Sequence, residues 1–226
     1  MSEFSGKVVL VTGAAGALGR AVVEHFAGEG AKIAQLDVIK LDNDHFSATP
    51  DLTDPEACRR AVEVVYKELG PIDVLANIAG GFAMGEAVHE TSAETWDFLM
   101  GLNAHSVLNM ARAVVPVMLE HGGGRIINIG AGAGQRGMGQ MGAYSASKSV
   151  VIRLTEAMAE ELKQQGINVN CILPSIIDTE RNRADMPDAD FSAWVTPAAM
   201  AKVVAFLASE AATPIHGAAL PVSGLS

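Results

Sequence analysis

Short apolar runs alternate along the chain with longer segments in which apolar residues recur at helical spacing. The short runs predict β-strands, and the longer segments predict amphipathic helices. Strands are expected at residues 7–12, 31–37, 46–49, 72–77, 125–129, 168–173 and 219–222. Helices are expected at residues 20–27, 55–69, 93–120, 143–165 and 197–209, and Pro116 is a position where the third of them can kink.

A strand followed by a helix, repeated, predicts a parallel sheet with right-handed crossovers. We therefore expect one α/β domain over residues 1–226, with a Rossmann fold and a doubly wound parallel sheet of about seven strands with helices on both faces. The content of 49% hydrophobic residues suits strands that are covered on both faces. Only eight residues separate Asp37 from Phe46, so this connection should be a short irregular arm rather than a helical crossover.

The composition limits the partners and the compartment. A net charge of −10 argues against nucleic acid and against an anionic membrane surface. No apolar run reaches the roughly 20 residues needed to cross a bilayer, and residues 3–7 pass into the first strand without a signal-peptide pattern. Cys58 and Cys171 predict buried free thiols in a reducing compartment, so we expect a cytoplasmic protein. The six histidines show no ligand spacing, so no metal is expected.

A glycine-rich turn follows the first strand and reads Thr12-Gly-Ala-Ala-Gly-Ala-Leu-Gly19. Strand, turn and helix in this order predict a pyrophosphate site, because small residues allow close approach and a helix N-terminus offers free N–H groups. Asp37 ends the second strand, where a carboxylate accepts the adenosine ribose hydroxyls and repels a 2′-phosphate. The predicted cofactor is therefore NAD, with NADH preferred over NADPH. The alternatives are a tight turn without a ligand and an aspartate that only caps the strand.

Tyr144 and Lys148 lie four positions apart and share one face of the predicted 143–165 helix. A phenol that titrates near pH 10 is a poor acid or base at neutral pH. A neighbouring ammonium group lowers the pKa of the phenol toward the range where acid–base catalysis is efficient. On spacing alone, the alternative is a solvated lysine one turn from a tyrosine, and the glycine-rich turn upstream favours the catalytic interpretation.

These features resemble the short-chain dehydrogenase/reductase family, and the resemblance runs essentially the whole length of the chain. Asn77-Ile-Ala-Gly80 is similar to the Asn-Asn-Ala-Gly segment of the family, and Asn170 to Thr179 is similar to the segment that cradles the nicotinamide, with Ser175 where glycine is usual. Asn103, seven residues after Trp96, matches the active-site asparagine that orders a water and supports the lysine.

The resemblance implies direct hydride transfer, with Tyr144 exchanging the proton and Lys148 binding the ribose hydroxyls. It also implies that Asp51 contacts the adenine amino group, and Ala17 stands where a glycine is common. The implied cofactor-binding residues are Gly13, Gly16, Ala17, Leu18, Gly19, Asp37, Asp51, Leu52, Asn77, Ala79, Gly80, Tyr144, Lys148, Pro174, Ile177 and Thr179.

The chain departs from the family at the catalytic serine, which lies 13 residues before the tyrosine. Ala131 occupies that position, and its methyl group cannot donate a hydrogen bond to a substrate carbonyl. Losing one donor aimed at developing negative charge costs about 3 kcal/mol. Gln135 is a candidate replacement donor, and a polar loop residue is the alternative interpretation.

Ala131, Ala79-Gly-Gly-Phe82 and, above all, Met186 to Trp194 resemble the dihydropteridine reductase branch of the family, which also lacks the serine. In a quinonoid pterin, negative charge spreads through a conjugated ring, so the substrate depends less on a single donor. The Met186–Trp194 match falls within the polar segment 178–196, which follows a strand end and is the expected substrate lid.

Several side chains are candidates for the substrate pocket besides Ala131 and Gln135. Arg181 or Arg183 would bind an anionic substrate, with a solvated arginine as the alternative. An apolar wall, or alternatively part of the core, is expected from Phe82, Met84, Met138 and Met141.

Three functions are compatible with the sequence. The first is an NAD(H)-dependent oxidoreductase acting on a small carbonyl, alcohol or conjugated compound. The second is a quinonoid dihydropteridine reductase, and the third is a catalytically silent NAD-binding sensor or scaffold. The resemblance also implies a homodimer or homotetramer built on the two long helices that begin near Ala93 and Ala143, although their apolar residues would equally serve the core.

Overall fold

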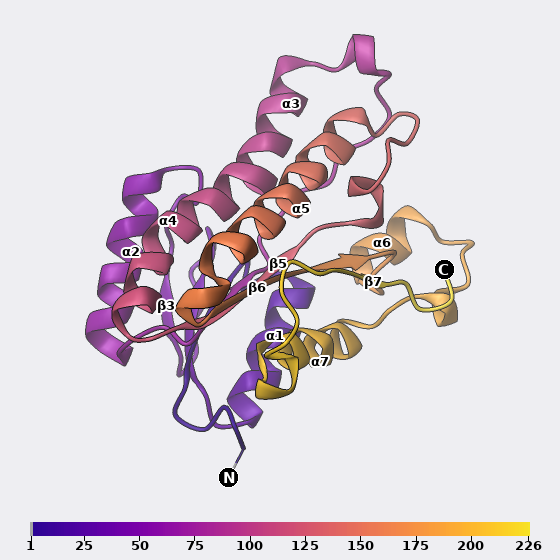
Figure 1. Ribbon diagram of the computed structural model, residues 1–226. Helices are drawn as coiled ribbons and strands as arrows, with labels where there is room; N and C mark the ends of the chain where they lie inside the picture. Colours follow the sequence, from indigo (N-terminus) through magenta and orange to yellow (C-terminus); the bar gives the residue numbers. More distant parts are fainter. Residues whose placement is uncertain (1) are drawn as a thin grey trace.

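The computed structural model describes residues 2–226 as one α/β unit (Figure 1). Met1, which the expected domain includes, lies outside the described residues. All strand pairs are parallel, and the sheet order is β3-β2-β1-β4-β5-β6-β7. The predicted doubly wound sheet of seven strands is therefore confirmed. Its strands are β1 Val8–Thr12, β2 Lys32–Leu36, β3 Phe46–Ala48, β4 Val74–Asn77, β5 Gly124–Ile129, β6 Ile167–Pro174 and β7 Ala219–Val222.

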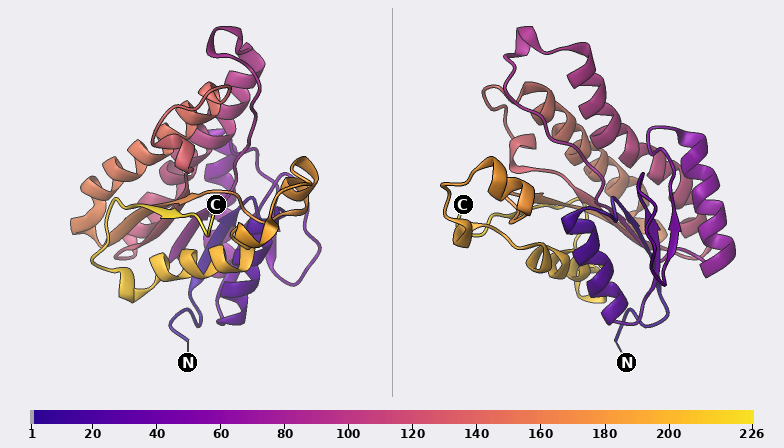
Figure 2. Two further views of the ribbon diagram at one scale, coloured as in Figure 1. Left: turned by 90° about the vertical axis from the view of Figure 1, so that its right-hand side faces the viewer. Right: turned by 180° about the vertical axis from the view of Figure 1, so that it is seen from behind.

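Helices cover both faces of the sheet (Figure 1, Figure 2). They are α1 Ala17–Gly28, α2 Pro55–Leu69, α3 Ala93–Leu99, α4 Ser106–Glu120, α5 Gly142–Leu162, α6 Glu180–Asp185 and α7 Pro197–Ala208. Successive side chains of a strand point to opposite faces. Accordingly, Val9 and Val11 of β1 pack into the core beneath α1 and α7, and Val8 and Leu10 pack against α2, α4 and α5.

The expected helix 93–120 is in fact interrupted. The chain forms α3, then a π-helical turn at Met100–His105, then α4. Helix α4 continues through Pro116, the position where a kink is expected. Pro116 faces solvent, so water can satisfy the carbonyl that a proline leaves without a partner. The interruption lies at the turn that carries Asn103, and π-helical turns often occur at functional sites.

Two connections differ in how regular they are. Residues 38–45 contain no helix or strand, as expected for a short arm between β2 and β3. The segment 178–196, expected to be irregular, contains α6, because Thr179 caps the N-terminus by accepting a hydrogen bond from the N–H of Asn182. No helix among residues 2–226 has the length and hydropathy required to cross a membrane.

Candidate functional site

The predicted site residues gather at the carboxyl edge of the sheet, where β2, β1, β4, β5 and β6 end side by side. Ligands of open α/β sheets bind at this edge, next to the point where the strand order reverses. Here the reversal lies at β1, which pairs with β2 on one side and β4 on the other. The glycine-rich turn follows β1 directly, so it occupies the reversal point.

The glycine-rich turn is packed too closely to accept larger side chains. Gly13 has φ +66°, and an added Cβ would lie 2.7 Å from the nitrogen of Ala79. An added Cβ at Gly19 would lie 2.1 Å from the carbonyl oxygen of Gly13. Gly16 is the N-cap of α1 and has no side-chain cap, so the first N–H groups of the helix stay available to a ligand.

Ala17 and Leu18, the two residues between Gly16 and Gly19, have different surroundings. Ala17, where a glycine is common, begins α1 and fits there without breaking the helix. Leu18 is buried and packs in the core beneath α1 and α7. Its expected contact with the cofactor is thus restricted to the backbone.

Asp37 bridges the end of β2 and the glycine-rich turn. One carboxylate oxygen accepts a hydrogen bond of 2.9 Å from the N–H of Ala15, and the other accepts one of 3.1 Å from the N–H of Ile39. The carboxylate therefore lies beside the turn expected to hold the pyrophosphate.

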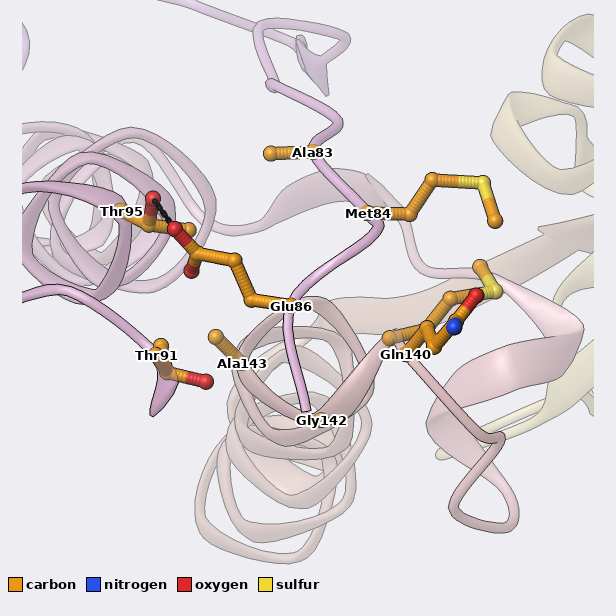
Figure 3. A pocket seen from close by; sticks show the side chains of 9 residues that line it. Ala83, Met84, Glu86, Thr91, Thr95, Gln140, Gly142 and Ala143 are labelled. Atoms are coloured by element: carbon orange, nitrogen blue, oxygen red, sulfur yellow. Dashed lines mark hydrogen bonds between the residues drawn. The ribbon is translucent and has the colours of Figure 1, made fainter. Parts of the chain in front are cut away.

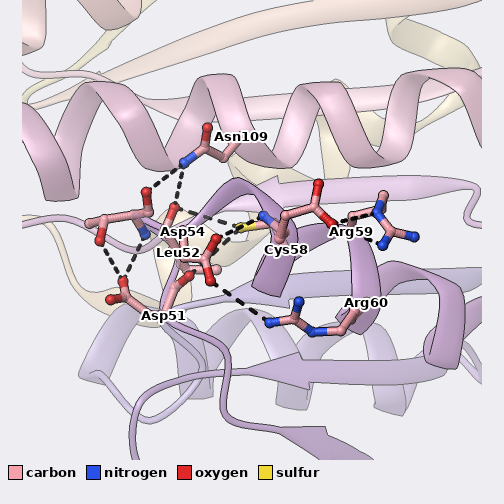
Figure 4. A network of polar contacts seen from close by, with 9 residues as sticks. Asp51, Leu52, Asp54, Cys58, Arg59, Arg60 and Asn109 are labelled. Carbon is pink, nitrogen blue, oxygen red and sulfur yellow. Dashed lines mark hydrogen bonds and ion pairs between the residues drawn. The ribbon is translucent and has the colours of Figure 1, made fainter.

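Asp51 begins a short loop between β3 and α2 (Figure 4). Its carboxylate is exposed and accepts hydrogen bonds from the side chain and N–H of Thr53 at 2.7 and 2.8 Å. These two bonds, the side-chain one first, lower the pKa of Asp51. The next residue, Leu52, is buried, so only its backbone is available to a ligand here.

Lys148 is buried and lies close to Tyr144. Its Nζ donates a hydrogen bond of 2.8 Å to the carbonyl of Ile129 at the end of β5, and it lies 6.0 Å from the centroid of the Tyr144 ring. Burial lowers the pKa of Lys148 to about 8 and raises the pKa of Tyr144 to about 12. Burial is the cause of the raised pKa of Tyr144 in this state, and the expected lowering of that pKa by Lys148 stays a prediction.

Asn103 lies in the π-helical turn and is almost fully buried. Its side chain accepts a hydrogen bond from the N–H of Gly81 at 2.8 Å and donates to the carbonyl of Gly81 at 3.1 Å and to Ser147 Oγ at 2.9 Å. An added Cβ at Gly80 would lie 2.9 Å from Asn103 Oδ1 and 3.3 Å from Lys148 Nζ. Asn103 and Lys148 therefore flank Gly80, as the sequence predicts for one site.

Ala131 lies two residues beyond the end of β5, is buried and has an extended backbone. Gln135, the candidate replacement donor, is exposed beyond the one-turn helix 132–134. The preceding residue is also constrained, because an added Cβ at Gly130 would lie 2.8 Å from Cys171 Sγ and 2.7 Å from Leu173 Cδ2.

The four apolar residues expected to form one wall of the substrate pocket do not all lie together. Phe82 packs edge to face against the ring of Tyr144, with centroids 4.9 Å apart. Met84 and Met141 line a small pocket of about 80 Å³ beside the N-terminus of α5, into which Glu86 projects (Figure 3). Met138 is 47% exposed and does not line this pocket. Tyr144 does not line it either, so this pocket is adjacent to the Tyr144 ring rather than over it.

The segment 178–196 is held at both ends. Ile177 and Val195 pair as a parallel bridge. Arg183 is bound to Asp178 at 2.7 Å and lies over the ring of Phe191, so its charge is already paired. Arg181 is 80% exposed and lies 3.8 Å from the Asp185 carboxylate, a longer contact, so it is the freer of the two arginines.

The segment after β6 holds the remaining predicted cofactor residues. Pro174 is buried at the end of β6, and Thr179 caps α6 two residues beyond Ile177. Ser175, which replaces the usual glycine, donates a hydrogen bond of 2.8 Å to the carbonyl of Ser223. The serine thus ties this segment to the residues that follow β7. Within residues 2–226, no three His, Cys, Asp or Glu side chains are grouped so that they could hold a metal ion.

Polar side chains hold this edge together, and two of them, Asn128 and Thr155, were not predicted from the sequence. Thr12 Oγ1 accepts hydrogen bonds from the N–H groups of Ile78 and Ala79, which ties β1 to β4. Asn77 Nδ2 donates to Asn128 Oδ1 at 2.8 Å, and Asn128 Nδ2 donates to Thr155 Oγ1 at 2.9 Å. This row of side chains joins β4, β5 and α5. The available signal was a polar residue inside an otherwise apolar strand.

Comparisons with known proteins agree with this geometry. The sequence profile of the family described as short chain dehydrogenase matches residues 7–190. The 3-oxoacyl-acyl-carrier-protein reductase FabG of Escherichia coli (strain K12) is 33% identical over 98% of both chains. The D-threitol dehydrogenase of Mycolicibacterium smegmatis is 34% identical over 98% of this chain and 93% of its own. The crystal structure of carveol dehydrogenase from Mycobacterium avium in complex with NAD has a TM-score of 0.88 at 27% identity and covers 99% of this chain and 98% of its own. The chain belongs to the short-chain dehydrogenase family and is an NAD(P)-dependent oxidoreductase.

Proposed function

We propose that this protein is an NAD(H)-dependent oxidoreductase that transfers hydride between nicotinamide and a small carbonyl, alcohol or conjugated compound. The observation that carries the proposal is the position of Tyr144 and Lys148 on α5, next to Gly80 and Asn103 at the carboxyl edge of the sheet. That edge also holds the glycine-rich turn and Asp37. Dinucleotide sites and acid–base pairs of this kind are expected at one edge of an open sheet.

The residues present fit the cofactor. The uncapped N-terminus of α1 offers backbone N–H groups to the pyrophosphate, and the missing Cβ atoms at Gly13 and Gly19 allow the turn to form. Asp37 would bind the adenosine ribose, and the Asp51 loop would bind the adenine. Asn77, Ala79, Gly80, Pro174, Ile177 and Thr179 would surround the nicotinamide half.

The proton chemistry is assigned to the chain's own side chains. When bound, the nicotinamide supplies or accepts the hydride. Tyr144 gives the proton to the substrate oxygen during reduction or takes it during oxidation. Lys148 holds its ammonium group beside the phenol and binds ribose hydroxyls. Asn103 holds Gly81 and Ser147 by hydrogen bonds and thereby orients the Gly80–Gly81 turn next to Lys148. A water held near Asn103 would pass protons to Lys148.

NADH is preferred over NADPH in this proposal. The Asp37 carboxylate lies beside the N–H of Ala15, where the ribose is expected, and it would repel a 2′-phosphate. No Lys or Arg stands at positions 14, 15 or 38 to bind that phosphate. Fluorescence titration of wild type and Asp37→Ser with both cofactors tests this. We expect wild type to bind NADH more tightly and Asp37→Ser to lose most of the difference; equal binding by wild type contradicts the preference.

Carbonyl compounds and alcohols are the first candidate substrates. The relatives named above are a 3-oxoacyl reductase, a threitol dehydrogenase and a carveol dehydrogenase, whose names all point to carbonyl or alcohol chemistry. Phe82 offers an aromatic wall next to Tyr144. With Ala131 in place of the serine, this enzyme would act on such compounds without one of the usual donors.

Quinonoid dihydropterin is the second candidate, and Ala131 is the observation that favours it. A conjugated ring that spreads charge depends less on a single donor such as the serine, and the segment from Met186 to Trp194 resembles the loop of that branch. Trp194 is buried and its ring packs at a tilt against that of Phe191, so it helps to shape the segment 178–196, the proposed substrate lid. A silent NAD-binding sensor is the third candidate.

The experiment is NADH oxidation by the purified protein with enzymatically generated quinonoid dihydropterin, beside a panel of ketones and β-ketoacyl esters. Fast turnover of a ketone or ester with inert pterin supports the first candidate. Rapid pterin reduction with little activity on ketones selects the second. Binding of NADH without turnover of any compound leaves only the sensor.

We also infer a homodimer or homotetramer and a cytoplasmic location. Leu99, Val107 and Val114 of the long helices are buried in the core, so they cannot form a subunit interface. Trp96 and Phe98 on α3 are 45% and 49% exposed and are the better candidates. Cys58 and Cys171 are free and buried, which fits a reducing compartment. Sedimentation analysis of wild type and Trp96→Glu tests the interface, and a wild-type monomer would contradict it.

A further inference from the structure

Asn109 of α4 reaches across to the loop that begins at Asp51 (Figure 4). Its side chain is almost fully buried, and Nδ2 donates hydrogen bonds of 3.0 Å to the carbonyl of Leu52 and 3.1 Å to the carbonyl of Thr53. Both donors of one amide are thus directed at consecutive carbonyls of the same loop. The loop and the asparagine are more than 50 residues apart in sequence.

The other polar groups of the loop are also directed inward. The carbonyl of Asp51 accepts a hydrogen bond of 3.1 Å from the N–H of Asp54, and Cys58 Sγ lies 3.6 Å from the carbonyl of Leu52. The two ends of a trans peptide bond point in opposite directions. The N–H of Leu52 therefore points away from the N-terminus of α2, and it donates to no group among residues 2–226.

This arrangement presents two complementary groups on one side of the loop. The Asp51 carboxylate is an exposed acceptor, and the N–H of Leu52 is an unused donor next to it. An adenine edge carries an amino donor beside a ring-nitrogen acceptor, so it matches this pair. The pair exists only while the carbonyls of Leu52 and Thr53 remain turned toward Asn109.

We propose that Asn109 is a positioning residue for the adenosine half of the cofactor. It holds the loop so that the Asp51 carboxylate and the Leu52 N–H face the adenine, and it touches neither the nucleotide nor the reacting atoms. The inference rests on the proposed binding of NADH at this edge of the sheet. Helix α4 would then serve both halves of the site, because it carries Asn109 and the turn that precedes it carries Asn103.

The test compares three ligands: NADH, ADP-ribose, which keeps the adenosine half, and reduced nicotinamide mononucleotide, which lacks it. We expect Asn109→Ala and the similarly shaped Asn109→Leu to weaken NADH and ADP-ribose by the same factor, about five- to tenfold, because the loop loses two hydrogen bonds. Affinity for reduced nicotinamide mononucleotide should be unchanged. Calorimetry gives the affinities for all three.

Asn168→Ala is the matched control. Asn168 is also buried, and its Nδ2 donates to the carbonyls of Thr213 and Ile215 at 2.9 and 3.0 Å, next to the amino end of β6. We expect this variant to lose stability and keep its affinity for ADP-ribose. Unchanged ADP-ribose affinity in the Asn109 variants, or an equal loss with reduced nicotinamide mononucleotide, overturns the inference.

Hydrogen exchange of the wild-type protein gives a measurement that needs no variant. ADP-ribose should protect the Leu52 amide, and reduced nicotinamide mononucleotide should not. An unprotected Leu52 amide in the saturated ADP-ribose complex contradicts the inference even if the variants fail to fold. If wild type binds neither NADH nor ADP-ribose, the proposed function falls as well. If it binds both while the Asn109 variants match it, only this inference falls.

Discussion

The ring of Phe82 meets the ring of Tyr144 edge to face, with centroids 4.9 Å apart and planes at 84°. Phe82 thereby contributes to the burial that raises the pKa of Tyr144 to about 12. A raised pKa keeps the phenol protonated to higher pH and leaves little phenolate to accept a proton from an alcohol.

Replacing Phe82 with Ala should therefore lower the pKa of Tyr144 toward its ordinary value near 10. In the oxidation direction, the rise of kcat/KM with pH should then begin at lower pH than in wild type. The measurement is the pH profile of alcohol oxidation. Phe206→Ala on α7 is the control, because Phe206 is comparably exposed, at 44%. A Phe82→Ala profile that coincides with wild type would show that Phe82 does not shield the phenol.

Lys148→Met should stabilise the protein at pH 7 while it abolishes activity. The folded-state pKa of Lys148 is lowered to about 8 from 10.5. Between these values the unfolded chain holds a proton that the folded chain has released, so wild-type stability rises with pH there and is lost as pH falls through 8. Below pH 8 the buried charge costs at most about 3 kcal/mol, reduced by its hydrogen bond to the Ile129 carbonyl.

Urea unfolding at pH 7 and pH 9.5 measures this difference. We expect Lys148→Met to be more stable than wild type at pH 7, with a smaller advantage at pH 9.5. Lys202→Met, which removes an exposed lysine on α7, serves as the control and should change neither value appreciably. A Lys148→Met protein that is less stable than wild type at pH 7 contradicts the prediction.

Ala131→Ser should restore the donor that most members of the resembled family carry. If the substrate is a ketone, the rate should rise about a hundredfold, since one donor aimed at developing negative charge contributes that much. Reduction of quinonoid dihydropterin should change little. Ala133→Ser makes the same chemical change at another buried alanine two residues away and should give no gain. Equal effects of the two substitutions would show that a serine at position 131 does not donate to the substrate oxygen.

Tyr144→Phe removes only the phenolic oxygen and should lower kcat about 10²- to 10⁴-fold, the usual contribution of a general acid or base. The affinity for NADH should stay close to that of wild type. The matched control is Tyr66→Phe, because Tyr66 is the other tyrosine of the chain and its hydroxyl contacts His121. Stopped-flow measurement of NADH oxidation gives the rate. Full activity in Tyr144→Phe would exclude this side chain as the proton donor.

Local signals predicted some elements with their bounds. Helix α2 begins and ends where the sequence predicts, because Asp54 caps it, Pro55 fits its first turn and Gly70 ends it at φ 103°. Strand β7 also has its predicted bounds. The π-helical turn at Met100–His105 was not predicted, since no residue preference marks such a turn and Asn103 is held by Gly81 and Ser147 from elsewhere in the fold.

Some features of the site could likewise be predicted from the sequence, and others could not. The glycine-rich turn, Asp37 and the Tyr144–Lys148 pair are encoded by neighbours in sequence, so their arrangement could be predicted. The pKa of Tyr144 could not, because it depends on burial, to which Phe82 contributes. Asn109 was overlooked for a similar reason, since its partners lie in a loop 56 and 57 residues away.

The hydrogen-bonded row from Asn77 through Asn128 to Thr155 has a direction. Each amide nitrogen donates to the next residue, and Thr155 Oγ1 finally donates to the carbonyl of Val151 at 2.8 Å. A substitution at the middle position leaves the Asn77 amide without its acceptor in a buried setting, and Thr155 keeps only its bond to the Val151 carbonyl. Over evolutionary time these three positions should therefore change together, so that a relative with a different residue at one of them also differs at the other two.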